Sequence, residues 1–248
     1  MPLPFPRLAS AVGRQAYRLG RRWGPRHAAL ARRFPLSVAF LWVGLACLLS
    51  MAVIDRPLAL ALKAQVQGDW QGFWRVVTAL GSGWPWYLGG LGVWGLARWR
   101  MARATWPASW MAWNARARAC LFLLLSLALS GVLVTVLKAL FGRLRPVWLF
   151  REGEYGFAPL SFDWAANSFP SGHSQTIWAV MTALMVVFPR HWPTWVALGT
   201  LVAASRLFLT VHYLSDVLMG TAIGIATAVL LARWARHRSM DLRLGKSR

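Results

Sequence analysis

Three short stretches of this chain place basic, imidazole and carboxylate side chains at fixed spacings. Together they supply three cations, two histidines and one carboxylate. Such a set is suited to binding a phosphate group and moving it to an imidazole nitrogen, because phosphoryl transfer depends on positioning and on distributed positive charge. In chain order the stretches are Lys138 with Arg145-Pro146, Pro170-Ser171-Gly172-His173, and Ser205-Arg206 with His212 and Asp216.

The third stretch pairs His212 with Asp216 at a spacing that puts both side chains on one face of a helix. A carboxylate that binds one imidazole nitrogen fixes the tautomer and leaves the other nitrogen free to attack. Arg206 precedes the pair inside an apolar segment, where a cation is costly unless it faces the bundle interior or an anion. The alternatives are an ordinary interfacial hydrogen bond for the pair and an arginine that reaches out to the interface.

The second stretch opens a predicted helix. Pro170 fixes the start, Gly172 lets the backbone approach a ligand closely, and the first N–H groups of a helix attract anions. We therefore expect Ser171 and Gly172 to donate main-chain hydrogen bonds to phosphate oxygens, and His173 to give a proton to a leaving oxygen. An ordinary helix cap would explain Ser171 but not His173.

The first stretch ends another apolar segment. Lys138 lies inside its end, Arg145 lies beyond it, and Arg143 adds a further cation. A fringe of lysine and arginine is common at the ends of membrane helices. Such fringes favour the cytoplasmic side, whereas this one falls on the predicted outer side, so an anion site is the better interpretation.

The composition predicts an integral membrane protein. Of the 248 residues, 57% are hydrophobic and the mean hydropathy is +0.45, above the range of soluble domains. We predict an all-α fold, a bundle of six transmembrane helices with an amphipathic helix over 55–83 at the outer surface. The predicted spans are 36–54, 84–98, 118–141, 173–189, 194–212 and 215–234.

The charge pattern sets the predicted orientation. The formal net charge is +21, but the basic residues flank apolar segments rather than forming one patch, which argues against nucleic acid as a partner. Most of them fall on one side if both termini are cytoplasmic. Among the 7 acidic residues, only Asp241 then lies inside. All three stretches face the outer, periplasmic side of the plasma (inner) membrane.

The predicted organisation is a basic cytoplasmic arm (1–34), a membrane domain (35–235) and a basic cytoplasmic tail (236–248). The arm is suited to lying on anionic lipid. Gly220 and Gly224 form a GxxxG that favours helix packing within the monomer over dimerisation. The acidic residues are few and scattered, so we predict no metal site and no cofactor.

The three motifs, in this order and at these spacings, resemble the type 2 phosphatidic acid phosphatase (PAP2) superfamily. The likeness runs from 138 to 216, and the signature also occurs in soluble bacterial acid phosphatases and vanadium-dependent haloperoxidases. It implies a metal-independent lipid phosphatase with a phosphohistidine intermediate. By resemblance, His212 is the nucleophile, Asp216 orients it, and His173 is the general acid and then the base. The implied phosphate cradle is Lys138, Arg145, Arg206, Ser171 and Gly172, with Arg143 and Ser205 as additional candidates.

The substrate class stays open among membrane lipids. Undecaprenyl pyrophosphate, phosphatidylglycerol phosphate, phosphatidic acid and the phosphate at the reducing end of lipid A all fit, and the aromatic segment 147–169 is expected to shape the entrance. Three rival functions keep parts of the same site. They are a phosphotransferase that passes phosphate to a lipid hydroxyl, a vanadate-dependent haloperoxidase, and a non-catalytic lipid-binding membrane protein.

Overall fold

The structure is a computed structural model, and it describes residues 27–161 and 163–244. Regular structure in these ranges is helical, and an isolated β-bridge joins Arg143 to Phe157. The chain divides into two compact units at Gly44, and the bundle of α6, α8, α9 and α10 belongs to the unit that begins at Leu45. Most of the predicted arm (1–34) and the end of the predicted tail lie outside the described residues.

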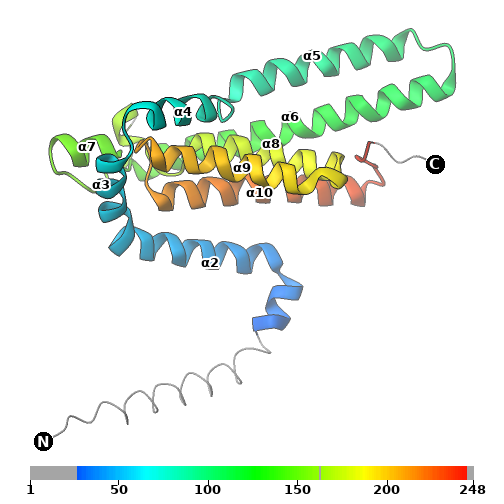
Figure 1. Ribbon diagram of the computed structural model, residues 1–248. Coiled ribbons are helices and arrows are strands. Elements are labelled where there is room, and N and C mark those ends of the chain that lie inside the picture. The colour runs from blue at the N-terminus through cyan, green and yellow to red at the C-terminus, as the bar shows by residue number, and fades with distance from the viewer. Residues whose placement is uncertain (1–26, 162, 245–248) are drawn as a thin grey trace, which may run out of the picture. The chain divides into compact units, whose positions relative to one another are not determined.

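The helices follow one another with short connections (Figure 1). In chain order they are α2 (Pro35–Leu49), the π-helix Ser50–Ile54, α3 (Asp55–Gln65), α4 (Gly68–Ala79), α5 (Gly83–Ala102), α6 (Pro107–Phe141), α7 (Pro146–Arg151), a 3-10 turn (Trp164–Ala166), α8 (Gly172–Val187), a 3-10 turn (Pro189–His191), α9 (Trp192–Phe208) and α10 (Leu214–His237).

Helix α8 lies at the centre of the bundle. Most of its side chains are buried, and it packs against α6, α9 and α10, which run beside it (Figure 1). Gly220 and Gly224 allow α10 to come close, since a Cβ at these positions would lie 2.3 Å from Ser171 O and 2.5 Å from Gln175 O. The GxxxG therefore packs two helices within the chain, as the sequence predicts.

Helix α6 carries the first motif to the site and then turns sharply. Its 35 residues span about 52 Å at about 1.5 Å per residue. The helix ends at Phe141 and is capped by Gly142, which has φ +57°, and a Cβ at Gly142 would lie 1.7 Å from Ala158 O. Only glycine fits this left-handed, tightly packed cap. The turn directs Arg143 and Arg145 toward the bundle.

The described part of the chain holds three helical segments that are long and apolar enough to cross a membrane. They are Pro35–Gln65, Pro107–Phe141 and Leu214–His237, and they overlap three of the predicted spans. The other predicted spans correspond to α5, α8 and α9, of 20, 16 and 17 residues. The fold is thus an all-helical membrane fold, and the count of six spans stays a prediction.

The segment predicted as one amphipathic helix over 55–83 forms two helices, α3 and α4. They are separated at Val66-Gln67, and Gly68 follows with φ +57°, a backbone state that glycine adopts at little cost. Helix α4 packs on α9, where the Trp74 and Phe208 rings stack at 4.3 Å between centroids. It ends before Gly81-Ser82-Gly83, the predicted break.

Gly224→Ala tests the close packing of α8 and α10. We expect it to lower the free energy of unfolding by about 1–3 kcal/mol, because the added methyl overlaps backbone atoms of α8. Gly89→Ala is the matched control, since nothing lies within 4 Å of a Cβ built there. Thermal unfolding of detergent-purified protein compares the two. Equal unfolding temperatures would contradict the packing described here.

Candidate functional site

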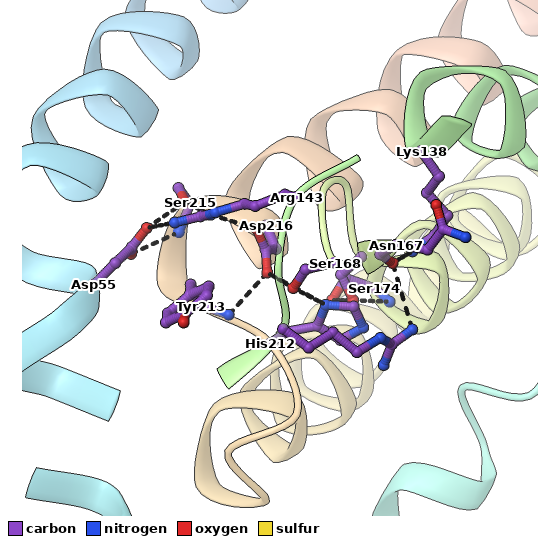
Figure 2. A network of polar contacts seen from close by, with 12 residues as sticks. Asp55, Lys138, Arg143, Asn167, Ser168, Ser174, His212, Tyr213, Ser215 and Asp216 are labelled. Atoms are coloured by element: carbon purple, nitrogen blue, oxygen red, sulfur yellow. Dashed lines mark hydrogen bonds and ion pairs between the residues drawn. The ribbon is translucent and has the colours of Figure 1, made fainter. Parts of the chain in front are cut away.

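The three motifs meet at one end of the bundle. The side chains come from the end of α6 and the loop after it, the start of α8, the end of α9, the following loop and the start of α10. Figure 2 shows Lys138 on one side of His212, and Arg143 with Asp216 on the other. Residues 73 positions apart in sequence, Arg143 and Asp216, are in direct contact there.

The His212 imidazole is held by Asp216. Its Nδ1 lies 3.3 Å from Asp216 Oδ2, and His212 and Asp216 are 4% and 0% exposed. The same oxygen accepts the backbone N–H of Tyr213 at 2.9 Å, which caps the start of α10. With Nδ1–H donated to the carboxylate, Nε2 carries the lone pair and is the nitrogen able to attack.

Ser168 is a further partner of this pair that the motif analysis does not identify. It is fully buried, its hydroxyl donates to Asp216 Oδ2, and it lies 3.4 Å from His212 Nδ1. It comes directly before Phe169-Pro170, so its position next to the second motif is the signal that could have found it. Asp216 Oδ2 thus receives hydrogen bonds from a hydroxyl, a backbone amide and an imidazole.

Arg143 lies on the carboxylate side of the site and not among the phosphate-binding candidates. Its Nη1 donates to Asp216 Oδ1, and its Nη2 donates to Asp55 Oδ2 at 2.8 Å. Burial acts to lower the pKa of Arg143, but Asp216 and Asp55 more than offset it and the pKa is raised. Both terminal nitrogens of Arg143 donate to carboxylates, so this cation neutralises two acids and is not available to bind a phosphate.

Lys138 and Arg145 converge on one backbone carbonyl. Lys138 Nζ donates to Asn167 O, and Arg145 Nη2 lies 3.4 Å from the same oxygen. The Arg145 guanidinium is further fixed by a 2.9 Å bond from Nε to Trp164 O and by the Trp164 ring, 4.1 Å away. Burial lowers the pKa of Arg145, and Asp216 partly offsets this.

Arg206 reaches the same region from α9. Its Nη1 donates to Thr78 Oγ1 on α4 at 2.7 Å, and its buried Nε has no hydrogen-bond partner within the described ranges. Across those ranges Lys138, Arg145 and Arg206 form no ion pair with a carboxylate. Two buried arginines and a half-buried lysine that form no ion pair with a described carboxylate make a site that favours a multiply charged anion.

The start of α8 completes the site and modifies one expectation. Ser171 caps the helix, but its N–H donates to Asp216 O at 2.9 Å, so this donor is already used. The N–H groups of Gly172 and His173 fall in the first turn, where a helix leaves its donors without intrahelical partners. Ser205, the other additional candidate, donates its hydroxyl to Val202 O at 2.6 Å within its own helix.

His173 lies beside the cations and under the turn between α4 and α5. A Cβ at Gly81 would lie 3.0 Å from His173 Cβ, so glycine lets this turn cover the imidazole closely. A groove of about 550 Å³ runs from Lys138, Gly172 and His173 along α5, α6 and α8, past Leu127 and Val132. The groove has room for an apolar tail of a ligand whose charged group binds to the adjoining cations.

The arrangement provides the elements of phosphoryl transfer to nitrogen. One oriented, buried imidazole lies in the same site as three cations that form no ion pair with a described carboxylate, and a second imidazole lies next to those cations. Among the described residues no group of three or more His, Cys, Asp and Glu side chains is placed to hold a metal ion. The positive charge at this site comes from arginine and lysine.

The chain matches known proteins in sequence and in fold. The PAP2 superfamily profile matches residues 119–240. The lipid A 1-phosphatase of Rhizobium johnstonii is 33% identical over 197 residues, which cover 76% of this chain and 78% of that protein.

Two crystal structures share the fold. The first, a transmembrane PAP2 type phosphatidylglycerolphosphate phosphatase from Bacillus subtilis, has a TM-score of 0.57 and 21% identity, and the match covers 84% of this chain and 98% of that one. The second, Aquifex aeolicus LpxE, has a TM-score of 0.54 and 20% identity, and the match covers 73% of this chain and 96% of that one.

Ser168→Ala tests the support of Asp216. We expect the rate of phosphate release to fall by about 10–100-fold, because a hydrogen bond to a charged group contributes about 1.5–3 kcal/mol. Ser126→Ala is the matched control, since Ser126 is equally buried but donates only to Phe122 O in its own helix. Equal rates for both variants would show that Ser168 does not hold the pair.

Proposed function

The chain belongs to the PAP2 superfamily and is a lipid phosphatase, and from this premise we propose that it removes phosphate from a membrane lipid through a phosphohistidine intermediate. The observation that carries the proposal is the buried His212–Asp216 pair beside three cations that form no ion pair with any carboxylate in the described ranges. The steps below follow from the positions of those side chains.

In the first step His212 Nε2 attacks the phosphorus atom of the lipid phosphate. The bond between phosphorus and the bridging oxygen breaks, and His173 gives that oxygen a proton. The imidazole of His212 gains positive charge, which Asp216 stabilises from the Nδ1 side. The products are the lipid alcohol, or a lipid monophosphate from a pyrophosphate, and a phosphorylated His212.

In the second step water replaces the imidazole. His173, now neutral, takes a proton from the water as its oxygen attacks phosphorus. The N–P bond breaks and its electron pair returns to His212 Nε2, so inorganic phosphate leaves and the enzyme is restored. A lipid hydroxyl in the place of water would give the phosphotransferase outcome.

The cradle consists of Lys138, Arg145 and Arg206 with the N–H groups of Gly172 and His173. Their fixed positive charge stabilises the nonbridging phosphate oxygens in both steps. The planar guanidinium groups suit a phosphate because each can make two parallel hydrogen bonds. This cradle supplies the charge that a metal ion supplies in other phosphatases, so we propose a metal-independent reaction.

The substrate we propose is the phosphate at the reducing end of lipid A. The support is the 33% identity over most of the chain to a lipid A 1-phosphatase, together with the groove that leads from the cradle between α5, α6 and α8. Phosphatidylglycerol phosphate is the second candidate, and its support is the Bacillus subtilis fold neighbour. Undecaprenyl pyrophosphate and phosphatidic acid fit the same chemistry.

We place the reaction at the outer face of the plasma membrane. The support is the excess of basic residues on the opposite side of the predicted spans, which favours a cytoplasmic position for both termini. In this orientation the phosphate lies at headgroup level, and the acyl chains stay in the bilayer.

Phosphate release from the four candidate lipids, measured with EDTA present, tests the proposal. We expect release from lipid A to be fastest and to persist in EDTA, because the cradle needs no metal. His212→Ala should release no phosphate while folding normally, since the nucleophile is lost. Release by His212→Ala at the wild-type rate, or activity that only a divalent ion restores, would contradict the mechanism. Phosphate found on a second lipid would show that the protein transfers phosphate to a lipid and does not hydrolyse it.

A further inference from the structure

Asp55 lies at the end of the first apolar segment, and the steps above do not use it. The residue is only 1% exposed, although it carries a carboxylate. It follows the π-helix Ser50–Ile54, whose wide turn is closed by the Asp55 N–H donating to Ser50 O. Single π-helical turns are frequent at functional sites. Here the turn sets the direction in which the Asp55 side chain leaves the helix.

Four donors converge on the Asp55 carboxylate. Oδ1 accepts from Ser50 Oγ at 2.6 Å and from the Ser215 N–H at 3.1 Å. Oδ2 accepts from Arg143 Nη2 at 2.8 Å and from Ser215 Oγ. A carboxylate satisfies all of these donors, whereas an amide would put its own N–H groups against some of them. The surroundings of Asp55 are therefore built for a negative charge.

Arg143 connects Asp55 to Asp216, as Figure 2 shows. Its Nη2 binds Asp55, and its Nη1 binds Asp216 and, at 2.6 Å, Ser215 Oγ. The guanidinium is fully buried and lies 4.3 Å from the centroid of the Tyr213 ring. Because a guanidinium is planar and rigid, the position of Asp55 determines how Arg143 presents Nη1 to Asp216.

A second contact joins the wide turn to the same arginine. The Tyr155 hydroxyl accepts from Arg143 Nη2 at 2.8 Å and donates to Met51 O, also at 2.8 Å. The π-helical turn is thus tied to Arg143 through Tyr155 as well as through Asp55. Burial raises the pKa of Tyr155, which keeps its hydroxyl protonated and able to donate.

The charges of this cluster favour the reaction, in addition to the effect of its geometry. Asp55 and Asp216 carry two negative charges around the single positive charge of Arg143, on the Nδ1 side of His212. The excess negative charge stabilises the positive charge that the imidazole gains when it attacks phosphorus. Fold stability is a weaker reason for the cluster, since buried ion pairs add little net stability.

From these contacts we propose that Asp55 is a positioning residue for phosphoryl transfer. Through Arg143 and Ser215 it holds Asp216, and through Asp216 it sets the orientation and charge of His212. The proposal rests on the proposed function, because it requires His212 to be the nucleophile.

Asp55→Asn and Asp55→Glu test this role, with Asp69→Asn as the matched control on the exposed surface of α4. The assay measures kcat and KM for phosphate release from lipid A in detergent micelles, alongside thermal unfolding. For Asp55→Asn we expect kcat to fall about 10–100-fold, because Arg143 loses a charged hydrogen-bond partner and holds Asp216 less firmly, with KM unchanged. Asp55→Glu should recover part of kcat, and Asp69→Asn should match the wild type.

The outcomes separate this inference from the proposed function. Wild-type kcat in Asp55→Asn, or a lower unfolding temperature with kcat unchanged, would overturn the positioning role and leave the proposed function intact. If Asp55→Asn does not fold, Asp55→Glu decides, since a folded protein with full kcat also overturns it. If the wild-type protein releases no phosphate from any of the four lipids, both the proposed function and the positioning role of Asp55 are contradicted.

Discussion

The buried carboxylate of Asp216 is the group around which the site is organised. It is fully buried, and its oxygens accept hydrogen bonds from the side chains of Arg143, Ser168 and His212 and from the backbone N–H of Tyr213. Removing a charge from water costs several kcal/mol unless hydrogen bonds and an opposite charge replace the water. These partners come from three separate loops, after α6, before α8 and before α10, so the carboxylate is stable only when the bundle brings them together.

The site separates paired from unpaired charge. On one side of His212, Arg143 lies between two acids and leaves a negative excess. On the other side, neutral oxygens hold the buried Arg145 and Arg206 and the half-buried Lys138. The imidazole is thus placed between a region that stabilises its own positive charge and a region that attracts phosphate. Both effects act in the direction of transfer to nitrogen.

The close approach of α10 to α8 is what places the two histidine motifs together. Gly220 and Gly224 remove the side chains that would hold these helices apart, and the resulting contact lets Asp216 O accept the Ser171 N–H. The packing of the bundle and the geometry of the site therefore have the same origin. Gly142 plays a similar part for Arg143 and Arg145 at the end of α6.

Motif spacing selects residues that the fold brings to one end of the bundle, because each motif is local and lies at a helix end. It does not reveal the partners that tertiary packing supplies. Asp55 is 160 residues from Ser215, and the sequence places it only at the end of an apolar segment. Arg143 is placed near the phosphate by its position in the first motif, whereas the two acids around it draw it to the other side. The break between α3 and α4 depends on the positive φ of Gly68, which composition does not specify.

Rapid quenching of the reaction with a ³²P-labelled lipid substrate tests the central claim most directly. The account predicts a phosphoenzyme that is labile to acid, stable to base and located on His212 by mass spectrometry, and that forms as fast as the lipid alcohol is released. Label on another residue, or release of lipid alcohol and phosphate at the full rate with no labelled protein at any time, would contradict it.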